Sequence, residues 1–173
     1  MEHVDARAVL FDRDGTLVED VPYNGDPLAV RPMEGAVAAV AAARAHGLAV
    51  GVVSNQSGVG RGLLTRDQLT AVNARVDEIF GAFDTWQICP HTPDDGCHCR
   101  KPEPGLVLAA CAELGALPEE TVVVGDIGGD VEAAERAGAR SVLVPTPATR
   151  AEEVWRADNV ADDLPTAMRL VLS

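Results

Sequence analysis

The chain has 173 residues and a net charge of −13, from 27 acidic and 14 basic side chains. Hydrophobic residues make up 47% of it and charged residues 24%, a globular composition that excludes a disordered chain. The charge disfavours binding to nucleic acid or anionic membranes, and the apolar runs are too short and alanine-rich to span a bilayer. The N-terminal residues lack the pattern of a secretion signal. We therefore expect one domain over residues 1–173, located in the cytoplasm.

Apolar runs alternate with helical patterns along the chain. The runs predict buried strands at 8–11, 48–54, 85–88, 121–124 and 141–144. The other patterns predict helices at 32–46, 65–80, 105–114, 131–137, 151–155 and 164–171. Thr65 and Gln68 fit a capping box at the start of the second helix. Wholly apolar strands that alternate with helices are typical of a parallel sheet covered on both faces, so the sequence predicts the α/β class.

Polar and reactive residues follow each of the first four predicted strands. In chain order they are Asp12 and Asp14, Ser54 to Ser57, Arg100 and Lys101, and Asp126 and Asp130. Because ligands bind at the carboxyl ends of parallel strands, we expect these residues to converge there. Carboxylates at such short separations repel unless they share a cation, and oxygen ligands with room for water suit Mg²⁺. Helix capping would explain one such acid, but not acids after successive strands.

The loop before Arg100 concentrates metal-ligand side chains. Two pairs of ligands, each spaced i, i+2, are separated by a five-residue stretch, and they are Cys89, His91, Cys97 and Cys99. Three thiolates and one imidazole can close a tetrahedral structural Zn²⁺ site. His98 is a competing imidazole, but it lies between two cysteines and would point away if both bind one metal. A disulfide is the other alternative, which a reducing cytosol disfavours. Cys111 falls in a helical pattern and is expected in the core.

Four motifs carry a family resemblance. FDRDGTLV, VVSNQSG, RKPEPG and VVGDIGGD resemble, in this order, the motifs of the haloacid dehalogenase-type phosphatases. The resemblance covers the chain from Ala8 to Val144. It implies a Rossmann-like three-layer sandwich around the parallel sheet, and transfer of a phosphoryl group to an aspartate. We therefore expect a phosphoric monoester hydrolase.

The resemblance also implies roles for individual residues. Asp12 would attack phosphorus and become an aspartyl phosphate. Asp14 would protonate the leaving alkoxide and then take a proton from the hydrolytic water. Ser54 would donate a hydrogen bond to a phosphoryl oxygen, and Lys101 would bridge the phosphoryl group and the nucleophile.

The same resemblance implies a Mg²⁺ site. Its ligands would be Asp12, the main-chain carbonyl of Asp14, and Asp126, while Asp130 would orient the ligands rather than bind directly. Many relatives carry a cap domain between the first three motifs. Here the predicted elements fill those intervals, so we expect no cap domain. The zinc loop, residues 89–99, would then form part of the pocket wall, and a monomer is the usual state of such a small core.

A capless core with a zinc loop resembles two groups of phosphatases. One acts on D-glycero-D-manno-heptose 1,7-bisphosphate, at the C7 phosphate, and the other on histidinol phosphate. SNQSGVGRG resembles the first group, whereas the second more often has an NQDG-type stretch. Ile127 is a departure, because the heptose enzymes often have a basic residue there. A broader sugar or nucleotide phosphomonoesterase remains open, as does a catalytically silent metal-binding module, which intact Asp12, Asp14 and Lys101 disfavour.

A substrate with two phosphates needs a second anion site. Arg61 and Arg100 are candidates for it, and Arg61 is equally explained as a solvated loop arginine. By match to the family, the expected substrate contacts are Asp20, Val21, Pro22, Tyr23, Ser54, Asn55, Gln56, Ser57, Arg61, Arg100 and Lys101. We expect a small phosphorylated sugar as the ligand, with no nucleic-acid or membrane partner.

Overall fold

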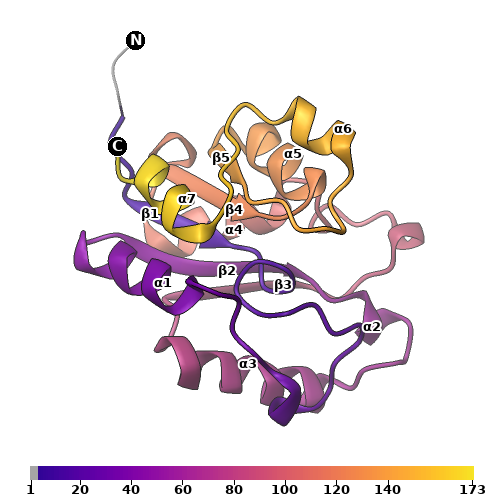
Figure 1. Cartoon of the computed structure of the whole chain (residues 1–173). Coiled ribbons are helices and arrows are strands. Elements are labelled where there is room, and N and C mark those ends of the chain that lie inside the picture. The colour runs from indigo at the N-terminus through magenta and orange to yellow at the C-terminus, as the bar shows by residue number, and fades with distance from the viewer. Residues whose placement is uncertain (1–3) are drawn as a thin grey trace.

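A central parallel sheet is the middle layer of the molecule. The computed structural model describes residues 4–173, and Figure 1 shows the sheet with α3 on one side and α5 on the other. The strand order is β3-β2-β1-β4-β5, and all neighbours are parallel. The strands are β1 (Ala8–Phe11), β2 (Ala49–Asn55), β3 (Thr85–Cys89), β4 (Thr121–Gly125) and β5 (Arg140–Leu143).

The α-helices connect and cover the strands. They are α1 (Ala36–Ala45), α2 (Ser57–Gly60), α3 (Arg66–Phe80), α4 (Gly105–Leu114), α5 (Gly128–Ala137), α6 (Ala151–Arg156) and α7 (Leu164–Val171). Short 3₁₀ turns lie at Pro27–Ala29, Pro93–Asp95 and Pro118–Glu120. Within residues 4–173, no helix is long and apolar enough to cross a membrane.

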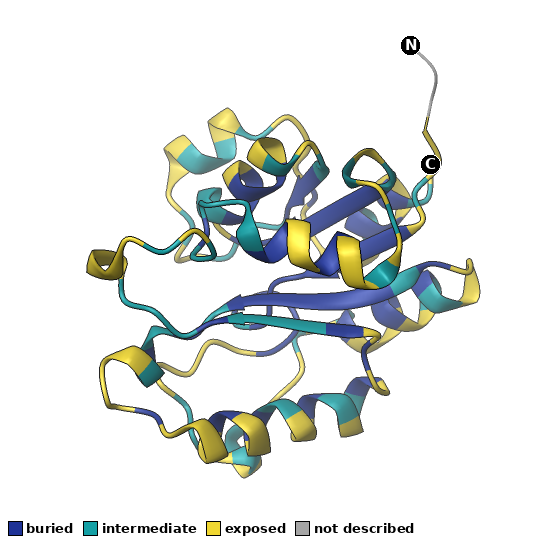
Figure 2. Cartoon of the chain, turned by 180° about the vertical axis from the view of Figure 1, so that it is seen from behind, coloured by how far each residue is buried: buried dark blue, intermediate teal, exposed yellow. Residues whose placement is uncertain are grey.

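Alternation along β1 divides the core into two halves. Val9 and Phe11 face a cluster that includes buried residues of α1, α3 and α7, whereas Leu10 faces a cluster with α4 and α5. Successive side chains of a strand point to opposite faces, so a strand buried on both sides must be apolar throughout. Figure 2 shows this as dark blue strands between helices whose outer faces are yellow. The result is the three-layer α/β sandwich that the sequence predicts.

The strand order places a switch point between β1 and β4. From β1 the chain adds β2 and β3 on one side, and then crosses back to add β4 and β5 on the other. Open parallel sheets bind ligands at the carboxyl ends of the strands where the order reverses. The crevice is therefore expected beside the residues that follow β1 and β4. The described segments from β1 to β3 hold the 3₁₀ turn, α1, α2 and α3, which leaves no room for a cap domain.

The predicted elements form, with corrections at their ends. The capping box of Thr65 and Gln68 is present at the start of α3. Helix α1 begins later than predicted because Gly35 precedes it in a left-handed conformation, φ 76°. Helix α5 begins earlier, at Gly128, since Asp130 bonds the main-chain N–H groups at its start. Helix α2 was not predicted, because a single turn is too short to show helical periodicity.

Candidate active site and metal-ligand clusters

Three buried carboxylates meet at the switch point. Asp12 directly follows β1, Asp126 directly follows β4, and Asp130 lies in the first turn of α5. Their carboxylate oxygens lie within 4.8 Å of one another. Burial raises the pKa of Asp12 well above its usual range, and the nearby charge of Asp130 raises it further. Burial likewise raises the pKa of Asp126 to about 6, again with a contribution from Asp130.

Lys101 is the cation paired with this cluster in the described part of the chain. Its Nζ donates to Asp12 Oδ1 at 2.9 Å, to Asp130 Oδ1 at 2.6 Å and to the carbonyl oxygen of Val53 at 2.8 Å. The carboxylates raise the pKa of Lys101 although burial opposes the shift. One lysine leaves the three acids with excess negative charge, and their ligand atoms are all oxygen. The cluster therefore fits a hard divalent cation such as Mg²⁺.

Asn55 fixes the main chain that carries Lys101. Its side-chain amide donates to the carbonyl oxygen of Lys101 at 3.1 Å and accepts from the N–H of Lys101 at 3.0 Å. Because Asn55 ends β2, this pair of bonds joins the loop after β3 to the neighbouring strand. The predicted substrate contact Asn55 thus also has a structural function in the loop.

Both carboxylate oxygens of Asp130 accept hydrogen bonds from the protein. Oδ1 accepts from Lys101, and Oδ2 accepts from the main-chain N–H groups of Asp126 and Ile127 at 3.1 and 3.2 Å. Asp126 is in turn bonded through Oδ1 to the hydroxyl of Thr16 at 3.2 Å. Asp130 thus connects Lys101 to the main chain that carries Asp126, and its expected role in orienting the site stays a prediction.

Asp14, two residues after Asp12, lines a pocket. Both of its oxygens accept from the guanidinium of Arg13, and Oδ2 also accepts from Gln56 Nε2 at 2.8 Å. The same Gln56 amide donates to Ser54 Oγ at 2.8 Å. Asp20 lies nearby, and burial together with the charge of Asp14 raises its pKa. Asp14, Asp20 and Gln56 therefore line one polar pocket, and Gln56 connects it to the buried hydroxyl of Ser54.

The pocket has a volume of about 210 Å³ and collects most of the predicted substrate contacts. Its lining residues are Arg13, Asp14, Asp20, Val21, Pro22, Tyr23, Asn55, Gln56, Ser57 and Gly58. Arg61 is exposed at the end of α2 and is not among these residues. Arg100 lines a neighbouring pocket of about 260 Å³, where Nη1 donates to the carbonyl oxygen of His91 at 3.4 Å. The structure thus separates both arginines from the first pocket.

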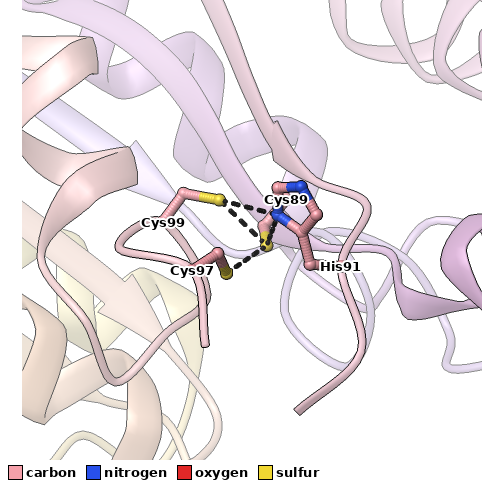
Figure 3. A group of neighbouring side chains, drawn as sticks. All are labelled: Cys89, His91, Cys97 and Cys99. Atoms are coloured by element: carbon pink, nitrogen blue, oxygen red, sulfur yellow. Dashed lines mark hydrogen bonds between the residues drawn. The ribbon is translucent and has the colours of Figure 1, made fainter. Parts of the chain in front are cut away.

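The predicted metal-ligand side chains of the loop form a second cluster (Figure 3). Cys89, His91, Cys97 and Cys99 place their ligand atoms within 4.8 Å of one another. Neighbouring ligand atoms lie 3.1 to 3.6 Å apart, close to the edge of about 3.8 Å of a tetrahedron with zinc–sulfur bonds of about 2.3 Å. The thiols are free, which excludes a disulfide in this structure. His98 is exposed and outside the cluster.

This second cluster is connected to the first through the chain. Cys89 ends β3, and the main-chain N–H of Arg100 donates to Cys97 Sγ at 3.4 Å. Lys101 follows directly, so the ligand loop positions the segment that brings Lys101 to Asp12. Cys111 is buried in α4, where its thiol contacts Thr121 Oγ1 at 3.4 Å, as expected for a core residue.

Known proteins are similar to this chain in sequence and in fold. A family model described as HAD-hydrolase-like matches residues 98–167. The D-glycero-β-D-manno-heptose-1,7-bisphosphate 7-phosphatase of Pseudomonas putida is 38% identical over 149 residues, which cover 81% of this chain and 83% of the relative. The chain belongs to the haloacid dehalogenase-like phosphatases. It is therefore an enzyme that hydrolyses phosphoric monoesters, as the four motifs predict.

Two further matches extend over nearly the whole phosphatase. A protein of the same name from Yersinia pestis is 33% identical over 179 aligned positions, covering 94% of this chain and 95% of the relative. The crystal structure of a D,D-heptose 1,7-bisphosphate phosphatase from B. bronchiseptica, complexed with magnesium and phosphate, is 28% identical. It superposes with a TM-score of 0.84 and covers 96% of this chain and 98% of that chain.

Two residues near Asp14 were not predicted from the sequence. Arg13 is buried and contacts Asp14, and Asn73 of α3 contacts Arg13. The sequence gives a signal for Arg13, because a charged residue that directly follows an apolar strand needs a partner if it is buried. Asn73 gave none, since its partner lies 60 positions away in the sequence.

Proposed function

We propose that this protein removes the C7 phosphate of D-glycero-D-manno-heptose 1,7-bisphosphate, with Mg²⁺ as cofactor. The observation that carries the proposal is the buried cluster of Asp12, Lys101 and Asp126 beside a polar pocket. The names of the two curated relatives support the substrate, and the SNQSGVGRG stretch resembles that group. The whole chain would act as one capless domain.

The first chemical step forms an aspartyl phosphate. A carboxylate oxygen of Asp12 attacks phosphorus, and the bond from phosphorus to the C7 oxygen breaks. Asp14 gives its proton to the departing alkoxide. Lys101 holds one oxygen of Asp12 and adds positive charge beside the transferred group. Ser54 Oγ, at the end of β2, donates to a phosphoryl oxygen.

The second step regenerates the enzyme. A water oxygen attacks phosphorus of the aspartyl phosphate, and its proton passes to Asp14. The bond between phosphorus and the Asp12 oxygen breaks, which restores the carboxylate and releases inorganic phosphate. Asp14 is thus an acid in the first step and a base in the second, and its partly exposed side chain in the pocket lining suits both.

Mg²⁺ would be held by Asp12, Asp126 and the main-chain carbonyl of Asp14, with Asp130 orienting the site. When bound, it neutralises the carboxylates and spreads the charge of the phosphoryl group. Zn²⁺ would be held by Cys89, His91, Cys97 and Cys99. The zinc would stabilise the loop that delivers Lys101 and would have no part in the chemistry.

The substrate would enter between the segment of Asp20 to Tyr23 and the start of α2. We propose contacts with Asp20, Val21, Pro22, Tyr23, Asn55, Gln56 and Ser57, all of which line the pocket. Arg61 and Arg100 would serve the second phosphate only if a long substrate reaches beyond that pocket. Ile127, exposed next to Asp126, offers that phosphate no charge.

A substrate panel tests the proposal. Phosphate release with Mg²⁺ is measured for both anomers of the heptose 1,7-bisphosphate, for histidinol phosphate and for fructose 1,6-bisphosphate at matched concentrations. We expect a heptose bisphosphate to lead in kcat/KM by at least about tenfold, or about 1.4 kcal/mol of transition-state discrimination. A higher kcat/KM for histidinol phosphate would contradict the proposed substrate. No turnover of any of these compounds would support the catalytically silent metal-binding module.

A further inference from the structure

Arg13 is a buried cation between the two aspartates of the first motif. It is 2% exposed, and its guanidinium contacts two side chains. Nε and Nη2 donate to Oδ1 and Oδ2 of Asp14, both at 3.1 Å, while Nη1 donates to Asn73 Oδ1 at 2.8 Å. Asn73 lies on α3, on the far side of the guanidinium from Asp14. A chain of three side chains thus runs from this helix to the carboxylate.

The geometry of the chain fixes the direction of the carboxylate. A guanidinium carries its donors in one plane, so a two-bond contact sets both the distance and the plane of its carboxylate partner. Burying such a cation is costly unless its donors are satisfied. Asn73 satisfies the donor that Asp14 does not reach, and it prevents the guanidinium from turning about its own side chain. The orientation of Asp14 therefore depends on Asn73.

The remaining contacts of Asp14 agree with a held rather than a free side chain. Gln56 Nε2 donates to Oδ2 at 2.8 Å, and the same amide reaches Ser54 Oγ. The side chain of Asp14 is still 26% exposed, toward the pocket where a substrate would lie. Asp14 is thus held by hydrogen bonds from Arg13 and Gln56, while part of its side chain remains accessible from the pocket.

We propose that Asn73 is a positioning residue that acts through Arg13 to aim Asp14 at the leaving-group oxygen. This inference rests on the proposed function of Asp14 as the general acid. Asn73 is not among the residues that line the pocket, and its side chain contacts Arg13 instead. Without the Asn73 amide, the side chains of Arg13 and Asp14 are still present but can rotate. Proton transfer is then slower, because the acid must lie within hydrogen-bond distance of the leaving-group oxygen.

The test uses the leaving group as a probe. An alkoxide is a strong base and departs poorly without a proton, whereas p-nitrophenolate is a weak base that needs none. kcat/KM is measured for the preferred sugar phosphate of the panel and for p-nitrophenyl phosphate, because kcat/KM reports the steps up to leaving-group departure. The proteins are wild type, Asn73→Leu, Asn73→Ala, Asn73→Asp and Asp14→Asn. Arg75→Leu is the control, an exposed change on the same helix.

We expect both apolar variants at position 73 to lose at least about tenfold in kcat/KM on the sugar phosphate, within the range that a general acid contributes. The loss on p-nitrophenyl phosphate stays within about threefold, because that leaving group needs no proton. Asn73→Asp keeps an acceptor for Arg13 and retains the wild-type ratio of the two substrates. Arg75→Leu changes neither value.

Two results would overturn the inference in different ways. In the first, Asp14→Asn loses activity selectively on the sugar phosphate, but the Asn73 variants lose activity equally on both substrates or not at all. Asp14 would then be the general acid, and Asn73 would not position it. In the second, Asp14→Asn shows no selective loss on the sugar phosphate. Asp14 would then not be the general acid, and the role inferred for Asn73 would be wrong as well. Melting temperatures are measured in parallel. If Asn73→Leu and Asn73→Ala show the same loss of activity, a folding defect in only one of them does not explain it.

Discussion

The main chain of Gly15 runs directly against the carboxylate of Asp126. A Cβ on residue 15 would overlap Oδ2 of that carboxylate, and the φ of Gly15 is +86°, in the region that side chains rarely adopt. The Asp126 carboxylate can therefore occupy its position only because residue 15 has no side chain. Both lie at the edge where Asp12 meets Asp126, so the packing of a glycine bears directly on the proposed metal site.

Gly15→Ala should damage that site more than it damages the fold. We expect kcat/KM to fall by about a hundredfold, because a displacement of about 1 Å at a reacting centre costs that much. Gly47→Ala is the matched control: its φ is +78°, and nothing lies within 4 Å of its Cβ position. That control should cost about 1–2 kcal/mol of unfolding free energy for the left-handed backbone and leave activity intact. Similar activity in the two variants would contradict this account of Gly15.

The two histidines of the ligand loop should behave differently. We expect His91→Ala to lose bound zinc and to melt at a lower temperature, because His91 Nδ1 contacts the thiols of Cys89 and Cys99. His98→Ala should retain about one zinc per chain, since His98 is exposed and outside the cluster. Metal analysis of the purified proteins measures both. Zinc lost from His98→Ala and kept in His91→Ala would contradict the ligand set, and wild-type protein free of zinc would contradict the metal.

Stability without Mg²⁺ should fall as the pH rises through the pKa of Asp126. Burial and Asp130 raise that pKa from an ordinary 3.8 to about 6, so the folded state binds this proton more tightly than the unfolded state. The stabilisation is complete below pH 3.8 and is lost as the pH passes about 6. Asp126→Asn removes this contribution, because an amide does not titrate in this range.

The measurement is the unfolding free energy from pH 4 to 7 in Mg²⁺-free buffer, for wild type and Asp126→Asn. We expect the wild type to lose stability relative to the variant across this range. Addition of Mg²⁺ should stabilise the wild type more at pH 7 than at pH 5, because protons compete with the metal for the carboxylate. Parallel pH profiles for the two proteins would show that Asp126 does not titrate as described.

The sequence predicts this fold well where local pattern determines structure. Val9, Leu10 and Phe11 are all buried, and a strand that is apolar on both faces is recognisable without any partner. The convergence of Asp12 and Asp126 follows from parallel topology alone, because strand ends share an edge. The Cys and His spacing likewise predicts the ligand cluster, since its members lie close in sequence.

The remainder depends on contacts between distant segments. Asn73 of α3 contacts Arg13, in the turn after β1, across 60 positions of sequence, and no feature near either residue indicates this contact. Arg61, at the end of α2, and Arg100, directly after the ligand loop, do not line the first pocket, and their expected contact with a second phosphate stays a prediction. Helix α5 begins at two glycines of low helical propensity because Asp130 caps it.

The central claim is that Asp12 is the nucleophile, and turnover by Asp12→Asn tests it most directly. Phosphate release from the preferred substrate is measured with Mg²⁺, after zinc content and melting temperature show that the variant is folded. We predict a loss in kcat of at least about a thousandfold, or about 4 kcal/mol, because an amide cannot form the aspartyl phosphate. Turnover by a folded Asp12→Asn variant at the wild-type rate would contradict the mechanism.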